Sequence, residues 1–279
     1  KIMKKLIIKP FLFKNEIDLL EIQLEELYDV VDYFILLETE RSFQNTIRED
    51  FGTYEKYKEK FSKFKDKILY TQLEKDKYDP NYEKVTPREK RNYNYEILKE
   101  VVRTYNFPSN TMVLYGDCDE FPKKEIVEKI RSGEIPTNEN TIFNLQMDLY
   151  YFYFNYICTS HPWNGFKLVS LPIFLNNPIY EVVRCAHDYR QLPTIQNCGW
   201  HYSYFGDVDY VLDKINTLSH VENKTDKIMD RDNILESMKT GRDIYFRNNH
   251  HWKILSKDNT SLPKIVQNHP EKYKNYFHG

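Results

Sequence analysis

The chain is poor in cysteine, and its few cysteines follow no metal-binding or disulfide pattern. Cys118, Cys158, Cys185 and Cys198 include no pair at the two-residue spacing of a zinc ribbon. Four cysteines in 279 residues are also unlike the dense frameworks of small disulfide-dependent secreted domains. We therefore expect reduced thiols in a soluble, cytoplasmic protein; any N-terminal anchor would lie outside this chain.

Long apolar runs, a positive charge balance and internal repeats are also missing. No stretch approaches the ~20 apolar residues that a membrane-spanning helix needs, and no signal peptide is recognisable. The formal net charge is −2, so no broad basic field attracts nucleic acid. What the chain does have is 41% hydrophobic residues over 279 positions, which is enough for a packed core.

The first half of the chain alternates between strand-like and helix-like segments. Residues 5–13 and 33–38 are apolar runs typical of buried strands, and an amphipathic helix that Asn15 is expected to cap lies between them. Such a strand–helix–strand unit implies parallel strands. Further helices and strands are expected at residues 54–67, 68–73, 87–105 and 112–115. The pattern predicts an α/β fold.

The second half is less regular. Residues 141–154 and 167–175 are expected strands, and residues 199–206 form an aromatic block between two glycines that carries His201. Helices are expected at residues 123–132, from Asp207 or Asp209 onward, at residues 225–240 and in short pieces over residues 262–277.

An acidic stretch follows the strand expected at residues 112–115. Gly116 releases the backbone, and three acidic residues follow within the next four positions. If the segment is extended, Asp117 and Asp119 point to one side and Cys118 to the other. Paired carboxylates at the carboxyl end of a parallel strand suit a hard divalent cation that also holds a substrate phosphate. A polar turn in which an aspartate caps the next helix is the alternative.

Five motifs, in order, resemble those of glycosyltransferase family 17, which includes the β-1,4-mannosyl-glycoprotein N-acetylglucosaminyltransferase that adds bisecting N-acetylglucosamine. The family patterns are FxNExDLLEIR, LYDVVDxFVLVE, RExxRN, SDVDEIP and GWHxS, and the similar segments are residues 13–22, 27–38, 88–92, 116–122 and 198–203. Gln23 stands where the family usually has Arg, and residues 44–48 replace a TxxGxxKP pattern. These departures affect the expected identity of the transferred sugar more than the expected type of reaction.

The resemblance implies a GT-A fold, which is a Rossmann-like nucleotide-sugar-binding fold with a mixed, mostly parallel central sheet, here followed by a C-terminal helical extension. One domain would span residues 1–279, with residues 1–122 binding the nucleotide and residues 123–279 facing the acceptor. The implied reaction is an inverting, metal-dependent transfer of a sugar, such as N-acetylglucosamine, from a UDP-sugar to a glycan or glycoprotein hydroxyl. Asp117, Asp119 and His220 would hold Mn²⁺ or Mg²⁺ against the diphosphate. Asp117 could instead reach the ribose or a metal-bound water, and a surface or capping role is the alternative for His220.

The other expected site residues follow from the same resemblance. The general base of an inverting transfer is expected at Asp209 or Asp207, although an aspartate there also suits a helix cap. The residues expected to contact the acceptor or sugar are Trp200, His201 and Glu120, with core packing as the alternative for the two aromatic residues. The expected donor contacts are Phe11, Phe13, Asn15, Glu16, Glu38, Arg91, Asp117 and Cys118.

Two other functions fit parts of this pattern. An aspartate-based phosphohydrolase of the haloacid-dehalogenase type also has two aspartates after a strand, but Phe121 stands where that motif carries Thr or Val. A sugar- or nucleotide-binding protein that has lost catalysis would keep the same motifs. The intact Asp117–Asp119 pair and the aspartates that follow the aromatic block argue against this second alternative.

Overall fold

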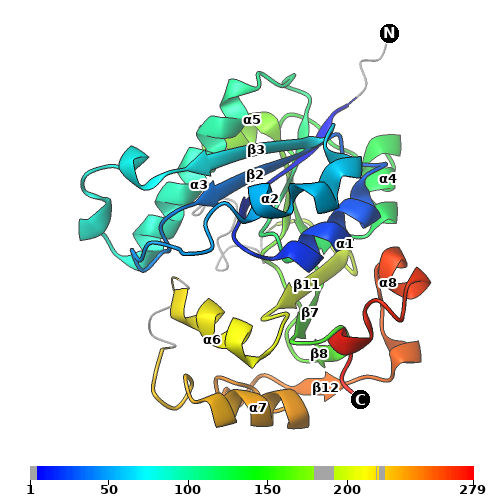
Figure 1. Cartoon of the computed structure of the whole chain (residues 1–279). Coiled ribbons are helices and arrows are strands. Elements are labelled where there is room, and N and C mark those ends of the chain that lie inside the picture. Colours follow the sequence, from blue (N-terminus) through cyan, green and yellow to red (C-terminus); the bar gives the residue numbers. More distant parts are fainter. Residues whose placement is uncertain (1–4, 179–191, 218, 220–223) are drawn as a thin grey trace.

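Two β-sheets organise the structure, which is a computed structural model describing residues 5–178, 192–217, 219 and 224–279 (Figure 1). The larger sheet has the order β10-β6-β9-β4-β1-β2-β3 and the smaller sheet the order β12-β8-β7-β11-β5. The larger sheet contains β1 (Ile7–Phe13), β2 (Tyr33–Thr39), β3 (Ile68–Leu73), β4 (Met112–Tyr115), β6 (Ile142–Leu145), β9 (Lys167–Ser170) and β10 (Thr194–Ile195). The smaller sheet contains β5 (Glu120–Pro122), β7 (Asp148–Tyr151), β8 (Tyr156–Cys158), β11 (Gly199–Ser203) and β12 (Trp252–Ile254).

The described α-helices cover both faces of the larger sheet and the outer side of the smaller one (Figure 1). They are α1 (Ile17–Leu27), α2 (Thr53–Tyr57), α3 (Pro87–Thr104), α4 (Lys124–Ser132), α5 (Leu171–Asn176), α6 (Val208–Thr217), α7 (Arg231–Thr240) and α8 (Lys264–Asn268). No described helix is long and apolar enough to cross a membrane.

Alternation along the strands builds a core on each face of the larger sheet. Ile7 of β1 packs with Leu20 and Leu24 of α1, whereas the next residue, Ile8, packs with Leu98 of α3 on the opposite face. The pairs β3-β2, β2-β1, β1-β4 and β10-β6 are parallel, and β9 runs antiparallel to both β4 and β6. The α/β class and the mixed, mostly parallel sheet are therefore confirmed.

Local signals placed some helix ends correctly and missed others. Thr86 accepts a hydrogen bond from the Glu89 amide in a complete capping box at the start of α3, and Gly133 ends α4 with φ 83°. The prediction that Asn15 caps α1 is wrong, because Glu16 is the N-cap residue and no side chain there caps the helix.

Three expected segments divide differently from the prediction. Residues 141–154 form two strands, β6 and β7, in different sheets, and an apolar run carries no signal of such a change of sheet. Residues 167–175 end as a strand at Ser170, whose hydroxyl accepts from the Ile173 amide and starts α5. Residues 54–67 form α2 and a 3₁₀ helix, Lys58–Phe64.

The last quarter of the chain is more than the expected helical extension. Strand β12 pairs with β8 and so completes the edge of the smaller sheet. Val266 of α8 and Tyr273 are buried in the same core as α1. The C-terminal segment thereby ties the smaller sheet to the first helix of the chain.

Candidate active site

The acidic stretch forms the turn by which the chain passes from the larger sheet into the smaller one. Strand β4 ends at Tyr115, and β5 begins at Glu120. A Cβ at Gly116 would lie 2.2 Å from a ring carbon of Phe166, so only glycine fits there. Cys118 points into the core, where the side-chain amide of Gln23 donates to its carbonyl at 3.0 Å. Gln23, which departs from the family pattern, thus supports this turn.

Asp117 is held by helix α3. Its Oδ2 accepts from Nη2 of Arg91 at 3.0 Å, and its Oδ1 accepts from the hydroxyl of Tyr95. The ammonium of Lys9, buried below the turn, donates to the Asp117 carbonyl at 3.3 Å. Asp117 and Arg91, both expected at the donor site, are therefore direct partners on one wall of a cavity.

Asp119 forms a buried ion pair with helix α6. Nζ of Lys214 donates to its Oδ2 at 2.6 Å, and Nε2 of His201 lies 3.7 Å from the same oxygen. Burial alone would raise the pKa of Asp119, but the Lys214 ammonium and the His201 ring hold that pKa well below its usual value. The carboxylate therefore stays charged.

Asp119, Glu120 and His201 could together hold a metal ion. Their ligand atoms lie within 4.8 Å of one another, and all three residues are buried. Two carboxylates and an imidazole are a donor set that Mn²⁺ accepts. Within the described residues, Nδ1 of His201 has no hydrogen-bond partner. The expected third ligand, His220, lies outside the described residues, and Asp117 does not belong to this group.

A cavity of about 630 Å³ opens in front of these side chains, a size typical of sites for small ligands. Six cationic side chains and four carboxylates line it, and the cations can meet the negative charge of a polyanionic ligand. The cationic residues are Lys14, Arg41, Arg48, Arg91, Lys214 and Arg247, and the acidic residues are Glu16, Asp117, Asp119 and Glu120.

Some wall residues were not expected from the sequence. Trp163 lies against His201, with ring centroids 4.4 Å apart. Arg247 is fixed by Asp243, whose Oδ1 accepts from its Nη2 at 2.7 Å. Lys214 sits inside an ordinary amphipathic helix, and Arg247 in an irregular segment. No local spacing distinguishes these two residues from surface cations. Trp163 lies two residues before Gly165, in a sequence that indicates only a turn.

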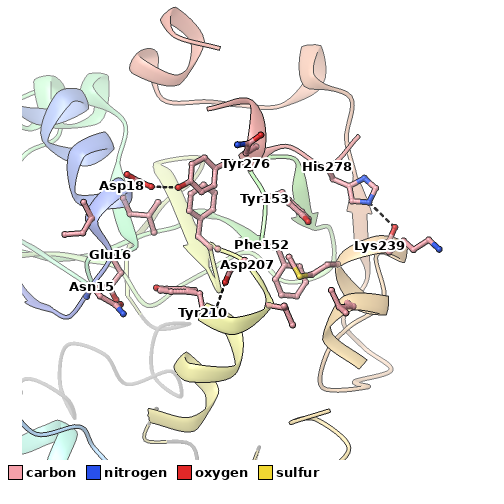
Figure 2. Close-up of a pocket in the computed structure, with 18 residues that line it drawn as sticks. Asn15, Glu16, Asp18, Phe152, Tyr153, Asp207, Tyr210, Lys239, Tyr276 and His278 are labelled. Carbon is pink, nitrogen blue, oxygen red and sulfur yellow. Dashed lines mark hydrogen bonds between the residues drawn. The ribbon is translucent and has the colours of Figure 1, made fainter. Parts of the chain in front are cut away.

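The aspartates expected to act as the general base lie outside this cavity. Asp209 is on the surface of α6, with 71% of its side chain exposed, and pairs with Arg231. Asp207 accepts a hydrogen bond from the Tyr210 amide at 2.9 Å, so it caps the helix, and it lines a neighbouring cavity (Figure 2). Neither aspartate lines the cavity that contains Asp119, so the structure gives no support to either as the general base, and both assignments stay predictions.

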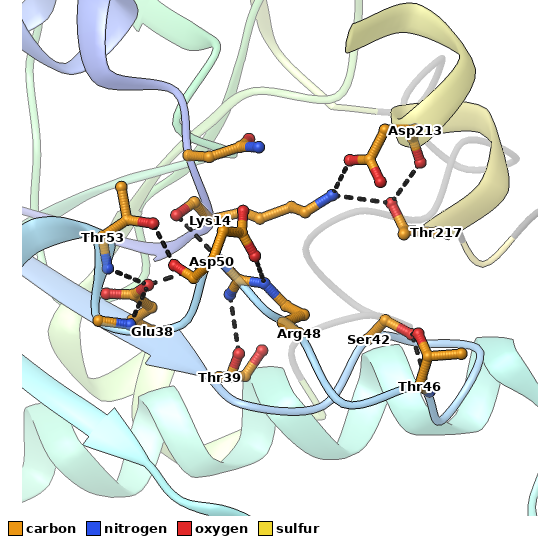
Figure 3. Close-up of polar contacts among 12 residues, drawn as sticks. Lys14, Glu38, Thr39, Ser42, Thr46, Arg48, Asp50, Thr53, Asp213 and Thr217 are labelled. Carbon is orange, nitrogen blue, oxygen red and sulfur yellow. Dashed lines mark hydrogen bonds and ion pairs between the residues drawn. The ribbon is translucent and has the colours of Figure 1, made fainter. Parts of the chain in front are cut away.

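Glu38, expected to bind the donor, instead accepts hydrogen bonds from groups of the protein itself (Figure 3). Its Oε1 accepts from the amides of Gly52 and Thr53 at 3.0 and 2.9 Å. Its Oε2 accepts from the Tyr54 amide at 3.3 Å and from the Tyr70 hydroxyl at 2.6 Å. The carboxylate is fully buried and does not line the cavity.

The other expected residues divide between the cavity and the core. Phe13 and His201 line the cavity, whereas Phe11 is buried in the core and is absent from the lining. Trp200 is likewise in the core, and its indole donates to the Ser261 carbonyl at 3.0 Å. Asn15 lines the neighbouring cavity.

The sequence model of glycosyltransferase family 17 matches residues 1–276, nearly the whole chain. No curated protein matches the chain.

Proposed function

Because the chain belongs to glycosyltransferase family 17, and is thus a glycosyltransferase with a sugar donor and an acceptor, we propose that its donor is a UDP-sugar, such as UDP-N-acetylglucosamine. The proposed acceptor is a hydroxyl of a glycan or glycoprotein, and the transfer inverts the anomeric carbon. The proposed fold is GT-A. Its support is the parallel array β3-β2-β1-β4, with the acidic turn at the carboxyl end of β4.

The observation that carries this proposal is that one cavity contains both a possible metal-binding group of two carboxylates and an imidazole, and several cationic side chains. Asp119, Glu120 and His201 would hold Mn²⁺ or Mg²⁺. Such an ion, when bound, stabilises the negative charge of the leaving diphosphate. Arg91 and Arg247 line the same cavity and add positive charge for that diphosphate.

The ion pair between Lys214 and Asp119 has a role of its own in this scheme. Burial lowers the pKa of Lys214, but Asp119, Tyr210 and Glu16 raise it by more. The pKa therefore lies well above its usual value, and the ammonium stays protonated. It brings a fixed positive charge to the cavity and holds Oδ2 of Asp119 in place. Trp163, whose ring lies against that of His201 at a tilted angle, helps to keep the imidazole oriented.

We also propose a reducing, cytoplasmic compartment. The described cysteines, Cys118, Cys158 and Cys198, are free and buried, which supports that compartment; Cys185 lies outside the described residues.

The test is release of nucleoside diphosphate from a panel of nucleotide sugars, with Mn²⁺ or with EDTA. We expect release with a UDP-sugar in Mn²⁺ and none in EDTA. Asp119→Asn should lower release ~100-fold or more and weaken UDP binding in Mn²⁺ but change it little in EDTA. No release from any donor would overturn the proposal.

The matched control is Asp29→Asn, since the Asp29 side chain is 71% exposed and pairs with Lys124 at the surface. Thermal unfolding of each variant separates lost metal binding from misfolding, because Asp119→Asn also leaves Lys214 without its carboxylate. An equal loss of UDP affinity in Mn²⁺ and in EDTA would give Asp119 a structural role.

A further inference from the structure

A second cavity, of about 730 Å³, lies beside the first one (Figure 2). Its walls come from segments far apart in the sequence: the start of α1, the residues after β7, the start of α6, helix α7 and the end of the chain. The segment that ties the smaller sheet to α1 thus also builds this cavity. Neither the family match nor the metal-binding group accounts for it.

The chemistry of the second cavity differs from that of the first. It has three carboxylates, Glu16, Asp18 and Asp207, and its cationic side chain, Lys239, is exposed. A phosphate would be repelled there. The aromatic residues Tyr153, Tyr210 and others supply flat apolar faces next to hydrogen-bond acceptors. Flat rings beside carboxylates and amides suit an uncharged ligand rich in hydroxyl groups, such as an oligosaccharide.

Glu16 is the one described residue that lines both cavities. Its Oε2 accepts from the backbone amides of Lys14 at 3.0 Å and Asn15 at 3.2 Å, which fixes the carboxylate. Among the described residues, its Oε1 accepts no hydrogen bond. Since Glu16 also raises the pKa of Lys214, its charge is felt at the ion pair of Asp119.

The loop that carries Glu16 is anchored to the helix that carries Lys214. Nζ of Lys14 donates to the hydroxyl of Thr217 at 3.1 Å and pairs with Asp213 of α6 (Figure 3). The loop that places the Glu16 carboxylate between the two cavities is therefore fixed to α6.

The other carboxylates of the second cavity are already engaged. Asp18 accepts from the hydroxyl of Tyr276 and pairs with Lys60 at 2.7 Å. Asp207 caps α6 through the Tyr210 amide. Of the three, only the carboxylate of Glu16 both faces the first cavity and keeps an oxygen open within the described part of the chain.

We infer that the second cavity binds an uncharged oligosaccharide acceptor, and that Glu16 accepts the proton of its attacking hydroxyl. This inference rests on the proposed transfer. The acceptor oxygen forms a bond to the anomeric carbon of the donor while its proton passes to the Glu16 carboxylate. The bond between that carbon and the phosphate oxygen breaks, and its electron pair leaves with the diphosphate.

The binding half is tested by saturation-transfer-difference NMR with three neutral trisaccharides, maltotriose, mannotriose and triacetylchitotriose, and with trigalacturonate as an anionic probe. We expect signals from at least one neutral probe and none from trigalacturonate. Tyr153→Ala should remove those signals, whereas Tyr105→Ala, an exposed aromatic outside both cavities, should retain them. No signal from any neutral probe, or signals that persist in Tyr153→Ala, would overturn the inference.

The proton-transfer half is tested with Glu16→Gln, whose amide oxygen can still accept from the Lys14 and Asn15 amides. We expect kcat of transfer to fall roughly 10²- to 10⁴-fold, with the Kd for UDP unchanged in Mn²⁺. Glu25→Gln is the matched control, since Glu25 is on α1, pairs with Lys63 and lines neither cavity. A matching loss of UDP affinity would assign Glu16 to the donor, and unchanged kcat would exclude it as the base.

These results also separate the inference from the proposed function. If the wild-type chain binds no UDP and releases none, the proposed function fails, while trisaccharide binding still reports on the second cavity. If UDP is released but no neutral trisaccharide binds, the transfer stands and the acceptor site lies elsewhere.

Discussion

Replacing Glu38 by glutamine separates a structural carboxylate from a donor-binding one. Glu38 is fully buried and accepts three backbone amides and one hydroxyl, and Arg48 lies 3.5 Å away. In Glu38→Gln, the amide oxygen can keep the bonds to Gly52 and Thr53, and the Tyr70 hydroxyl can reverse to accept. The Tyr54 amide is then left facing a donor, and Arg48 loses its opposite charge.

The expected cost can be worked from these contacts. A buried donor without a partner costs about 1–3 kcal/mol, and hydrogen bonds to a charged group are worth about 1.5–3 kcal/mol each. We therefore expect Glu38→Gln to lower the free energy of unfolding by about 3 kcal/mol. For a chain of this size that loss corresponds to a fall in Tm of roughly 5 °C.

Urea unfolding followed by circular dichroism measures the loss, and calorimetry measures UDP affinity on the folded variant. Affinity should match the wild type, since Glu38 does not line the cavity. Glu55→Gln, on helix α2 with half of its side chain exposed, should cost less than ~1 kcal/mol. A variant with wild-type stability and weakened UDP binding would refute the reasoning and return Glu38 to the donor site.

Two further predictions concern the walls of the first cavity. The pKa of Asp243 is lowered because the hydrogen bonds from Arg247 outweigh burial, so its stabilisation is complete above the ordinary value of 3.8 and is lost as the pH falls below it. Asp243→Asn should therefore lower the free energy of unfolding by ~3 kcal/mol at neutral pH. Urea titrations near pH 3 should show a smaller difference in unfolding free energy between wild type and variant. An equal difference at both pH values would contradict the assignment. Gly116→Ala should destabilise the chain by about 1–3 kcal/mol, because its Cβ would lie 2.5 Å from Oε2 of Glu120. The same displacement should raise the Mn²⁺ concentration needed for donor cleavage. Wild-type values in both the urea titration and the Mn²⁺ titration would show that the turn can relax.

Local patterns predicted the features of the chain that depend on neighbours in sequence. The capping box of Thr86 and Glu89 is such a feature, as is the apolar face of α1. The position of Asp117 and Asp119 after β4 also follows from a local pattern, because a strand that ends in an acidic turn at a parallel sheet edge is visible in the sequence.

The partners of these side chains depend on contacts that no local pattern carries. Glu38 ends a strand as a ligand-binding carboxylate would, yet the amides after Phe51 fold back onto it. Lys214 reaches Asp119 across 95 positions of sequence. Asp209 has the residue type and place of a base, but the rotation of α6 turns it to solvent and Lys214 inward. Such outcomes depend on tertiary packing.

The turn at Gly116–Asp119 is also one of the places where the chain crosses between the two sheets. Strand β5 pairs with β11, which carries His201, while β4 pairs with β1 inside the larger sheet. A ligand that contacts both His201 of the smaller sheet and Arg91 of α3, which packs on the larger sheet, therefore bridges the two sheets. Ligand at 100 times its Kd adds ~2.7 kcal/mol to the stability of the state that binds it. That energy cannot be confined to one sheet, so binding should make the unfolding of the two sheets more cooperative.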